Sequence, residues 1–168
     1  MLPKAKNADF NKRRQAIAGF SLIELLIVVA IILIIAAIAI PNYMRSKILA
    51  NEAATVQNVR NITTAEVIYS TTYGIGYSAL LVNLGGTGTP TPTNAILLDD
   101  VLAQGTKSGF TVTYASSNPD VNGRPTAFTV NAAPVDVGHT GNRYFFTDQT
   151  GVIRQSVSGP ATVTDTPI

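Results

Sequence analysis

The fold is decided by residues 19–41, GFSLIELLIVVAIILIIAAIAIP. From Phe20 to Ile40 the stretch is apolar except for Ser21 and Glu24, and Pro41 closes it. As a helix rising roughly 1.5 Å per residue, it would be about 31 Å long, and the hydrocarbon core of a membrane is about 30 Å thick. A buried helix of a water-soluble domain rarely lacks a polar stripe over such a length. The stretch therefore predicts one membrane-spanning helix.

The charges around this helix predict its orientation. Five cations and one acid precede it, whereas the charges that follow are sparse and of both signs. Lys and Arg are enriched on the cytoplasmic side of membrane helices. We therefore expect a cytoplasmic N-terminus, a single pass and an exported C-terminal part. The cations of this leader are Lys4, Lys6, Lys12, Arg13 and Arg14, and its acid is Asp9.

Glu24 lies one turn inside the apolar helix, where a carboxylate needs a partner. An unpaired carboxylate in hydrocarbon is costly, so it is protonated or takes a cationic partner. Cleavage after Gly19 would give Phe20 a free, cationic amine beside Glu24. The sequence thus predicts a processing site between Gly19 and Phe20, with residues 1–19 removed as a leader peptide.

This arrangement resembles the processing site of type IV prepilins and their pseudopilin relatives. The resemblance rests on a small residue, a phenylalanine, an acid at the fifth position after the cut, an apolar span and then a proline. It implies cleavage and N-methylation at Phe20 by a prepilin peptidase and methyltransferase of the bacterial inner membrane. It also implies that Glu24 pairs with the N-terminal amine of a neighbouring subunit. Phe20, Glu24 and Pro41 are the residues to which the resemblance gives a role in assembly.

Two other interpretations of the apolar stretch remain open. A secretory signal peptide would be cut after small residues such as Ala37 or Ala39, but its apolar core usually has about 7–15 residues. An early glutamate is also unusual in a signal peptide. The second alternative is a generic single-span anchor for a monomeric binding domain.

The charge balance argues against nucleic-acid binding as the primary function. The whole chain has 12 basic and 10 acidic residues, net +2. Residues 1–19 hold five of the basic and one of the acidic residues, so the processed chain has seven basic and nine acidic residues, net −2. The basic character belongs to the leader, and no basic patch follows it. The chain also has no cysteine, so the exported part cannot use the disulfide found in many pilins.

The same helix is expected to continue after Pro41 to residue 72. Pro41 lacks a backbone donor and crowds the preceding turn, so a bend or local unwinding is expected there. Residues 42–72 repeat apolar side chains in steps of three and four, which predicts an amphipathic helix with one buried face. The apolar positions are Ile48, Leu49, Ala53, Val56, Val59, Ile62, Ala65 or Glu66, Val67 and Tyr69.

Residues 73–168 predict a small globular head. Glycine, threonine and proline at 85–93 predict a mobile surface loop, and Asn94 is expected to cap a short helix that ends at Leu102. Alternating segments at 110–114, 127–130, 144–147 and 152–155 predict three or four antiparallel strands, and the tail from Ser158 is expected to be loose. The expected fold is α+β and lollipop-shaped, with a long N-terminal transmembrane or stalk helix packed on a small antiparallel sheet.

No catalytic constellation or cofactor site is predicted. His139 is the single histidine and is interpreted as a loop residue. Residues 118–123, NPDVNG, imitate the first half of a calcium loop, but the position for a closing glutamate is Thr129, so a turn is favoured over a metal site. Residues 61–63, NIT, fit an N-glycosylation acceptor but lie in the middle of the predicted helix.

These observations favour a structural subunit of a homo-oligomeric type IV pilus filament, delivered by the inner-membrane assembly machinery to the cell exterior. The alternatives are a major pseudopilin of a type II secretion system and the monomeric membrane-anchored binding domain. Motility, adhesion and DNA uptake are not distinguished by any motif.

Overall fold

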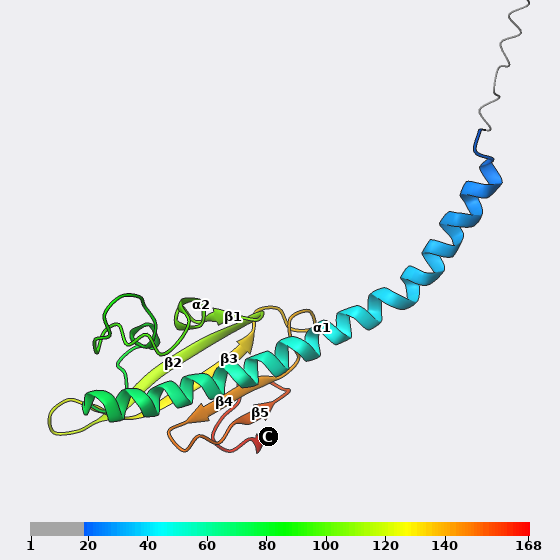
Figure 1. Cartoon of the computed structure of the whole chain (residues 1–168). Coiled ribbons are helices and arrows are strands. Elements are labelled where there is room, and N and C mark those ends of the chain that lie inside the picture. The colour runs from blue at the N-terminus through cyan, green and yellow to red at the C-terminus, as the bar shows by residue number, and fades with distance from the viewer. Residues whose placement is uncertain (1–18) are drawn as a thin grey trace, which may run out of the picture. The chain divides into compact units, whose positions relative to one another are not determined.

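The computed structural model describes residues 19–168, drawn in colour in Figure 1. The predicted leader lies outside these residues, apart from Gly19. The chain divides into an N-terminal unit that ends at Ile40 and a C-terminal unit that begins at Pro41.

Helix α1, Leu22–Tyr73, belongs to both units and contains Pro41. A bend or local unwinding is expected at Pro41; the backbone stays helical on both sides of it, so the chain does not unwind there. A proline has a φ close to the helical value and removes one backbone donor, which a long helix can tolerate. Among the described residues, α1 is the one helix that is long and apolar enough to cross a membrane.

The C-terminal unit contains an antiparallel sheet with the strand order β1-β2-β3-β4-β5-β6. Each strand pairs with the next along the chain, so the sheet is a meander. The six strands found in residues 19–168 exceed the three or four predicted, because β1 and β6 have two residues each and show no alternation. The strands are β1 (Thr106–Lys107), β2 (Phe110–Pro119), β3 (Pro125–Pro134), β4 (Tyr144–Asp148), β5 (Arg154–Ser156) and β6 (Thr166–Pro167).

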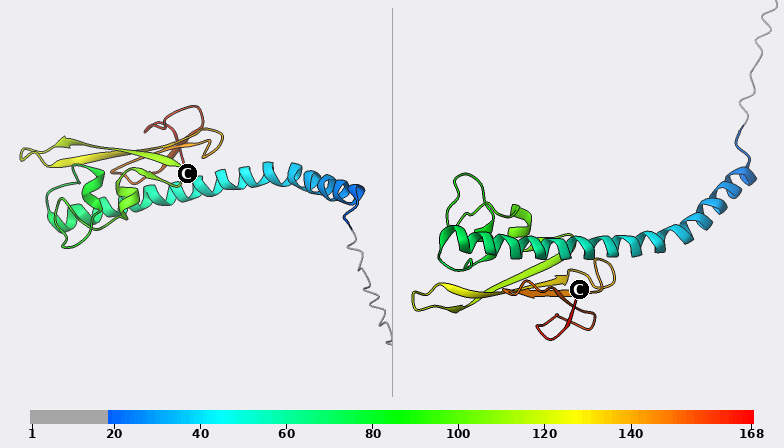
Figure 2. Two further views of the ribbon diagram at one scale, coloured as in Figure 1. Left: turned by 90° about the horizontal axis from the view of Figure 1, so that it is seen from above. Right: turned by 60° about the horizontal axis from the view of Figure 1, so that its bottom comes forward.

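The hydrophobic core lies between one face of this sheet and the part of α1 that follows Pro41 (Figure 2). Alternation in β2, β3 and β4 sends their apolar side chains to this face, and the register places Val130 opposite Tyr114 on one side and Thr147 on the other. The prediction of an α+β fold with a helix on a small antiparallel sheet is confirmed. The largest fully buried apolar side chains are Phe110, Phe128, Phe145, Ile62, Leu84 and Leu102.

The short helix predicted from Asn94 to Leu102 is wrong. The helix α2 is only Asp100–Ala103, and Asp99 caps it by accepting the backbone N–H of Leu102 at 3.1 Å. Residues 95–98 instead bond back to the 3-10 helix η1, Leu81–Leu84, and its neighbours; for example, the Leu97 N–H donates to the Leu84 carbonyl at 2.7 Å. Ile96 adopts a left-handed φ of 54°, which ends any helix there.

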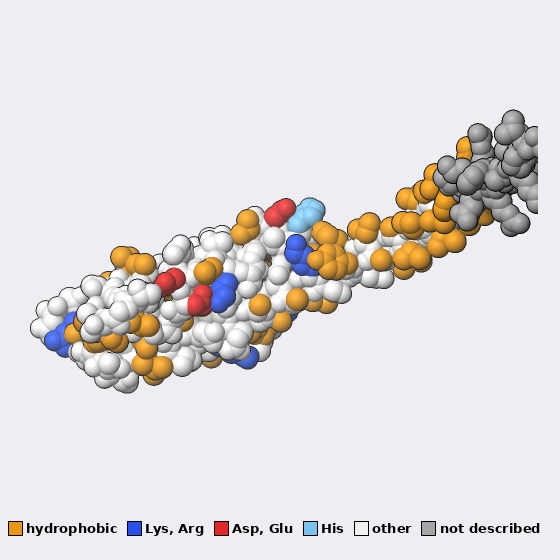
Figure 3. Space-filling model, turned by 45° about the horizontal axis from the view of Figure 1, so that its top comes forward, with side chains coloured by type: hydrophobic (Ala, Val, Ile, Leu, Met, Phe, Trp, Pro, Cys, Tyr) orange, Lys and Arg blue, Asp and Glu red, His pale blue; other side chains and the backbone are white. Residues whose placement is uncertain are grey.

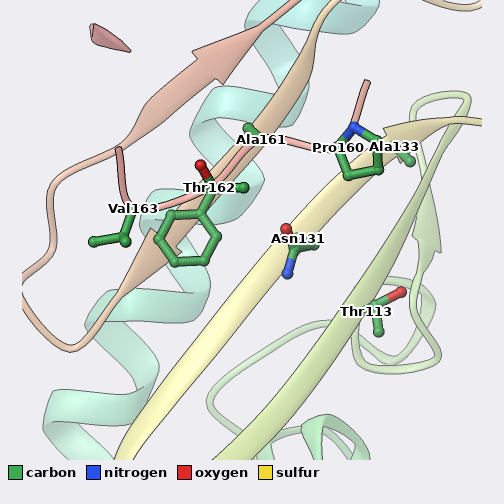
Figure 4. Close-up of a pocket in the computed structure, with 8 residues that line it drawn as sticks. Thr113, Asn131, Ala133, Pro160, Ala161, Thr162 and Val163 are labelled. Carbon is green, nitrogen blue, oxygen red and sulfur yellow. The ribbon is translucent and has the colours of Figure 1, made fainter. Parts of the chain in front are cut away.

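The tail that begins at Ser158 is ordered against the sheet, so the prediction of a loose tail is wrong. Ala161 is 3% exposed, and β6 pairs with β5. Residues 160–163 cross the sheet face opposite α1 and, with Phe146 and polar residues of β2 and β3, line an open groove of about 600 Å³ (Figure 4). Residues 158–168 are rich in threonine and proline and contain few apolar residues, so the sequence pattern does not predict that they pack on the sheet.

The buried face of α1 is more polar than the sequence pattern predicted. Leu49, Ala53 and Val67 are exposed, whereas four polar residues are buried: Glu52, Thr55, Asn58 and Glu66. The Glu52 carboxylate accepts the backbone N–H groups of Asn142 and Arg143 at 2.7 and 3.1 Å, and the Arg143 Nε donates to it at 2.7 Å. This ion pair and its hydrogen bonds connect α1 to the start of β4.

Glu66 is fully buried without a cation among the described residues. Its carboxylate accepts the backbone N–H of Ser78 at 2.9 Å and the Ser78 hydroxyl at 2.5 Å, and the Tyr114 hydroxyl donates to the Ser78 carbonyl at 2.8 Å. Burial raises the pKa of Glu66 above its usual value, and the hydrogen bonds from Ser78 oppose this only in part. Burial and the nearby Glu66 also raise the pKa of Tyr114.

Replacing Arg143 by alanine should destabilise the full chain in detergent, because the buried Glu52 carboxylate keeps only backbone donors. We expect the free energy of unfolding to fall by about 2–3 kcal/mol, less than the roughly 3–5 kcal/mol for a fully buried pair, because the Arg143 side chain is 35% exposed. Chemical denaturation followed by circular dichroism measures the change. Arg60→Ala is the matched control, since Arg60 is exposed on the same helix and forms no ion pair among residues 19–168. Equal, small effects of both variants would contradict the role assigned to Arg143.

Replacing Glu66 by glutamine should make stability less dependent on pH. Because the pKa of Glu66 is raised in the fold, the unfolded chain loses this proton first, and stability falls as pH rises between the unfolded and folded pKa values. Glu66→Gln removes this loss, so its stability relative to the parent should increase from pH 5 to pH 8 in thermal unfolding of the full chain in detergent. Asp120→Asn provides a control that should keep the pH dependence of the parent over this range, because backbone hydrogen bonds lower the pKa of Asp120 and its carboxyl is ionised in both the folded and the unfolded chain from pH 5 to pH 8. A difference between Glu66→Gln and the parent that is the same at both pH values would refute the argument.

Candidate functional site

The predicted processing site lies just before α1. Gly19 and Phe20 are non-helical and exposed, with Phe20 75% exposed, and the first backbone hydrogen bond of the helix joins the Leu25 N–H to the Ser21 carbonyl at 3.2 Å. A Cβ added to Gly19 would meet no atom within 4 Å. The described part of the fold therefore does not require glycine at this position.

Glu24 lies in the first turn of α1. A carboxylate is favoured there by the positive end of the helix dipole. Its side chain is exposed, and no ion pair within residues 19–168 involves it. Phe20 and Glu24 are one helical turn apart in sequence. A free amine at Phe20 would thus carry positive charge at the same end of the helix as the carboxylate.

The surface of α1 between Leu22 and Ile40 is apolar on every side. All of its large hydrophobic side chains are exposed. Figure 3 shows hydrophobic side chains along the face of this segment that is turned to the viewer. A water-soluble monomer rarely exposes so large an apolar area, which marks a membrane or protein interaction surface. These side chains are Leu22, Ile23, Leu25, Leu26, Ile27, Val28, Val29, Ile31, Ile32, Leu33, Ile34, Ile35, Ile38 and Ile40.

Pro41 follows this surface directly and is exposed. It lies 17 residues after Glu24, which is about 25 Å along a helix. The structure therefore does not gather Gly19, Phe20, Glu24 and Pro41 into one pocket. They are distributed along one apolar rod, with a charge at one end and a proline at the other.

The other candidate chemical residues lie in turns and loops of the head. Asp120 Oδ1 accepts the backbone N–H groups of Asn122 and Arg124 at 2.8 Å each, in the turn between β2 and β3. His139 Nδ1 lies 3.3 Å from Asp136 Oδ2 in the loop before β4, and both side chains are mostly exposed. Within residues 19–168, no group of three or more His, Cys, Asp or Glu side chains could hold a metal ion.

Sequence reasoning missed the buried charges of the head. Glu52 falls outside the apolar spacing of residues 42–72, and no sequence pattern indicates a role for Arg143. Glu66 alone carried a signal, because it falls at the apolar spacing of the helix. These residues position α1 on the sheet and lie apart in sequence from the apolar segment.

Comparison with known proteins supports the reading of the N-terminal segment. Residues 14–40 match the family model described as the prokaryotic N-terminal methylation motif. The type IV major pilin protein PilA of Myxococcus xanthus (strain DK1622) is 46% identical over 57 residues, which make up 34% of this chain and 24% of that protein. The match thus spans about a quarter of the relative's length. No solved structure matches the chain.

The matched residues include Gly19, Phe20, Glu24 and the whole apolar run. The resemblance predicted from these residues is therefore confirmed. In its N-terminal segment, the chain carries the prokaryotic N-terminal methylation motif and is similar to a type IV pilin.

Proposed function

We propose that the chain is a structural subunit that polymerises into a type IV pilus filament through its apolar N-terminal helix after cleavage by a prepilin peptidase. The observation that carries this proposal is the apolar surface from Leu22 to Ile40, which is exposed on all sides and interrupted only by Glu24. A catalytic function has no comparable support, because the charged residues described in the head serve in ion pairs, caps and turns or, for Glu66, in hydrogen bonds to Ser78.

The apolar rod has two environments that would cover it. Before assembly it would lie in the inner membrane, which its length and composition fit. After extraction, the rods of many subunits would pack against one another in the centre of a filament. Burying one Leu, Ile or Val side chain is worth about 1.5–3 kcal/mol, so the summed contacts favour a bundle. The heads would then be displayed outside the bundle.

Processing would supply the cation that Glu24 needs. In the uncut chain the nitrogen of Phe20 is a neutral amide, whereas after cleavage it becomes an amine, which is mostly protonated at neutral pH. In a low-dielectric bundle an unpaired carboxylate is costly, and a subunit placed so that its amine reaches the Glu24 of its neighbour avoids this cost. The pair would thus fix the axial register of neighbouring subunits. N-methylation of Phe20 would keep the positive charge.

The partners of the chain in this proposal are other copies of itself, the prepilin peptidase and methyltransferase, and the inner-membrane assembly machinery. Electron microscopy of sheared surface material tests the function directly. Long extracellular fibres that contain this chain are expected. Absence of fibres, together with loss of protein secretion when the gene is deleted, would instead identify a pseudopilin of a type II secretion system.

Mass spectrometry of the mature protein should place its N-terminus at Phe20, with residues 1–19 absent and a methyl group on the amine. Gly19→Leu should block the cut and leave full-length precursor in the membrane. A Cβ at Gly19 meets no atom of the described chain, so a block would reflect the protease and not misfolding. Ser21→Ala is a matched control that alters the far side of the cut and should be processed. An N-terminus after Ala37 or Ala39 would disprove the proposal, because the assembly helix would be lost.

Glu24→Val should insert into the membrane normally, because the span becomes more apolar, but it should form few or no filaments. Glu24→Asp keeps the charge with a shorter reach and should give an intermediate filament yield. Immunoblots of sheared fibres and of membrane fractions measure the two steps separately. Ile23→Val is the matched control, a change of one methylene next to Glu24, and should assemble as the parent does. Normal filament abundance with Glu24→Val would show that the pairing is not needed.

A further inference from the structure

The loop between η1 and α2 is held in a defined conformation by its own hydrogen bonds. The Asn94 side-chain amide donates to the carbonyls of Thr87 and Thr89 at 2.8 and 3.3 Å, and Thr91 and Asn94 exchange backbone hydrogen bonds at 3.0 Å. A Cβ on Gly86, whose φ is 104°, would overlap Asn94 Oδ1, so this closure requires glycine there. Residues 85–93 thus form a surface loop, as the sequence predicts, and the hydrogen bonds of Asn94 close it.

The loop is also attached to α1. The Tyr69 hydroxyl, on a side chain that is otherwise buried in the core, donates to the Pro92 carbonyl at 2.8 Å. At the other end, the Gly86 N–H donates to Asp100 Oδ1 at 2.8 Å. Backbone groups within residues 86–92 thus take part in these hydrogen bonds, and the side chains of residues 87–93 are exposed.

Threonine and proline alternate across the exposed part of this loop. Residues 87–93 read TGTPTPT, and all seven are exposed. Thr87 and Thr89 have hydroxyls without a hydrogen-bond partner among the described residues, and the hydroxyls of Thr91 and Thr93 contact only each other, at 3.4 Å. By contrast, the hydroxyls of Thr63 and Thr71 in α1 donate to helix carbonyls. The loop therefore concentrates accessible hydroxyl groups on a fixed backbone.

The loop itself carries no charged residue, and the charged group that contacts its backbone, Asp100, is an acid. No charged residue occurs between Glu66 and Asp99, and Lys107, the next cation, is paired with Asp99 at 2.7 Å. A phosphate on the loop would therefore find no free arginine or lysine from this segment to pair with. A neutral polar group needs no such partner. Segments rich in threonine and proline are typical of O-glycosylated chains.

We propose that residues 87–93 are an O-glycosylation site for neutral sugars, with Thr87, Thr89 and Thr93 as acceptors. In the transfer, the threonine Oγ1 would attack the anomeric carbon of a sugar activated as a nucleotide or lipid diphosphate. The new C–O bond forms as the bond to the diphosphate breaks, the diphosphate leaves with the bonding electrons, and the hydroxyl proton passes to a base of the glycosyltransferase. The N-glycosylation pattern at Asn61 is not the site, because the Asn61 side chain lies in the middle of α1 and accepts a hydrogen bond from Gln57.

The site can be tested on the mature protein purified from the cells that produce it. The intact mass should exceed that of the chain from Phe20 to Ile168 by whole sugar residues. Trypsin cuts after Arg60 and Lys107 and leaves the loop on one peptide, 61–107. Electron-transfer fragmentation of this peptide should place the added mass on residues 87–93. An unmodified peptide, a phosphate on the loop, or sugar only on other residues would overturn the proposal.

A triple variant, with alanine at Thr87, Thr89 and Thr93, should lose the added mass. The matched control replaces Thr106, Thr111 and Thr113, which are exposed on β1 and β2, and should keep it. Retention of the full mass in the loop variant would overturn the proposal. The same spectra report whether the N-terminus is Phe20, so failure of this inference is distinguished from failure of the proposed processing.

Discussion

The structure depends on an apolar surface that the chain itself leaves uncovered. From Leu22 to Ile40 every large side chain of α1 except Glu24 is hydrophobic, and all of these hydrophobic side chains are exposed. At about 1.5–3 kcal/mol for each buried side chain, covering this surface is worth more than the roughly 5–15 kcal/mol that stabilises a typical domain. A membrane, and in our proposal a bundle of identical helices, are the two environments that satisfy it. In the same proposal, pairing of Glu24 with the N-terminal amine of a neighbour gives this otherwise uniform surface a defined axial register.

The part of α1 that follows Pro41 is fixed on the sheet by a different combination of interactions. Its contact with the sheet combines apolar packing, around Ile62 and Phe145, with the buried Glu52, which bonds to backbone N–H groups just before β4. A second buried acid, Glu66, bonds to the backbone N–H of Ser78 in the segment after the helix. Such polar contacts add little net stability but penalise a rotated or shifted helix, because a misplaced Glu52 or Glu66 would be buried without partners. With no cysteine in the chain, these contacts have no disulfide to assist them.

Charged residues are distributed differently in the apolar rod, in the helix–sheet contact and in the loop. Five cations between Lys4 and Arg14 precede the apolar rod in sequence. The buried charges of the head connect α1 to β4 and to the segment after the helix. The loop at 85–94 carries no charge and bonds through its backbone and Asn94. Rod, helix–sheet contact and loop are thus built on three kinds of interaction: exposed apolar area, buried hydrogen-bonded acids and local turn hydrogen bonds.

The sequence by itself determined the features that depend on local composition. The unbroken apolar run predicts the N-terminal helix. Phe20 and Glu24 predict the family motif. Alternation in residues 110–114 and 127–130 predicts the central strands. Only the tertiary structure decided which side of α1 is buried, because Leu49 and Val67 match the apolar spacing yet lie on the surface, while Glu52 is 2% exposed. It also decided that residues 95–98 are not helical, that β1 and β6 join the sheet, and that the tail covers Phe146. Except for β1, which pairs with the adjacent β2 but is too short to show alternation, the deciding partners are non-local in sequence, so neither propensity nor periodicity could reveal them.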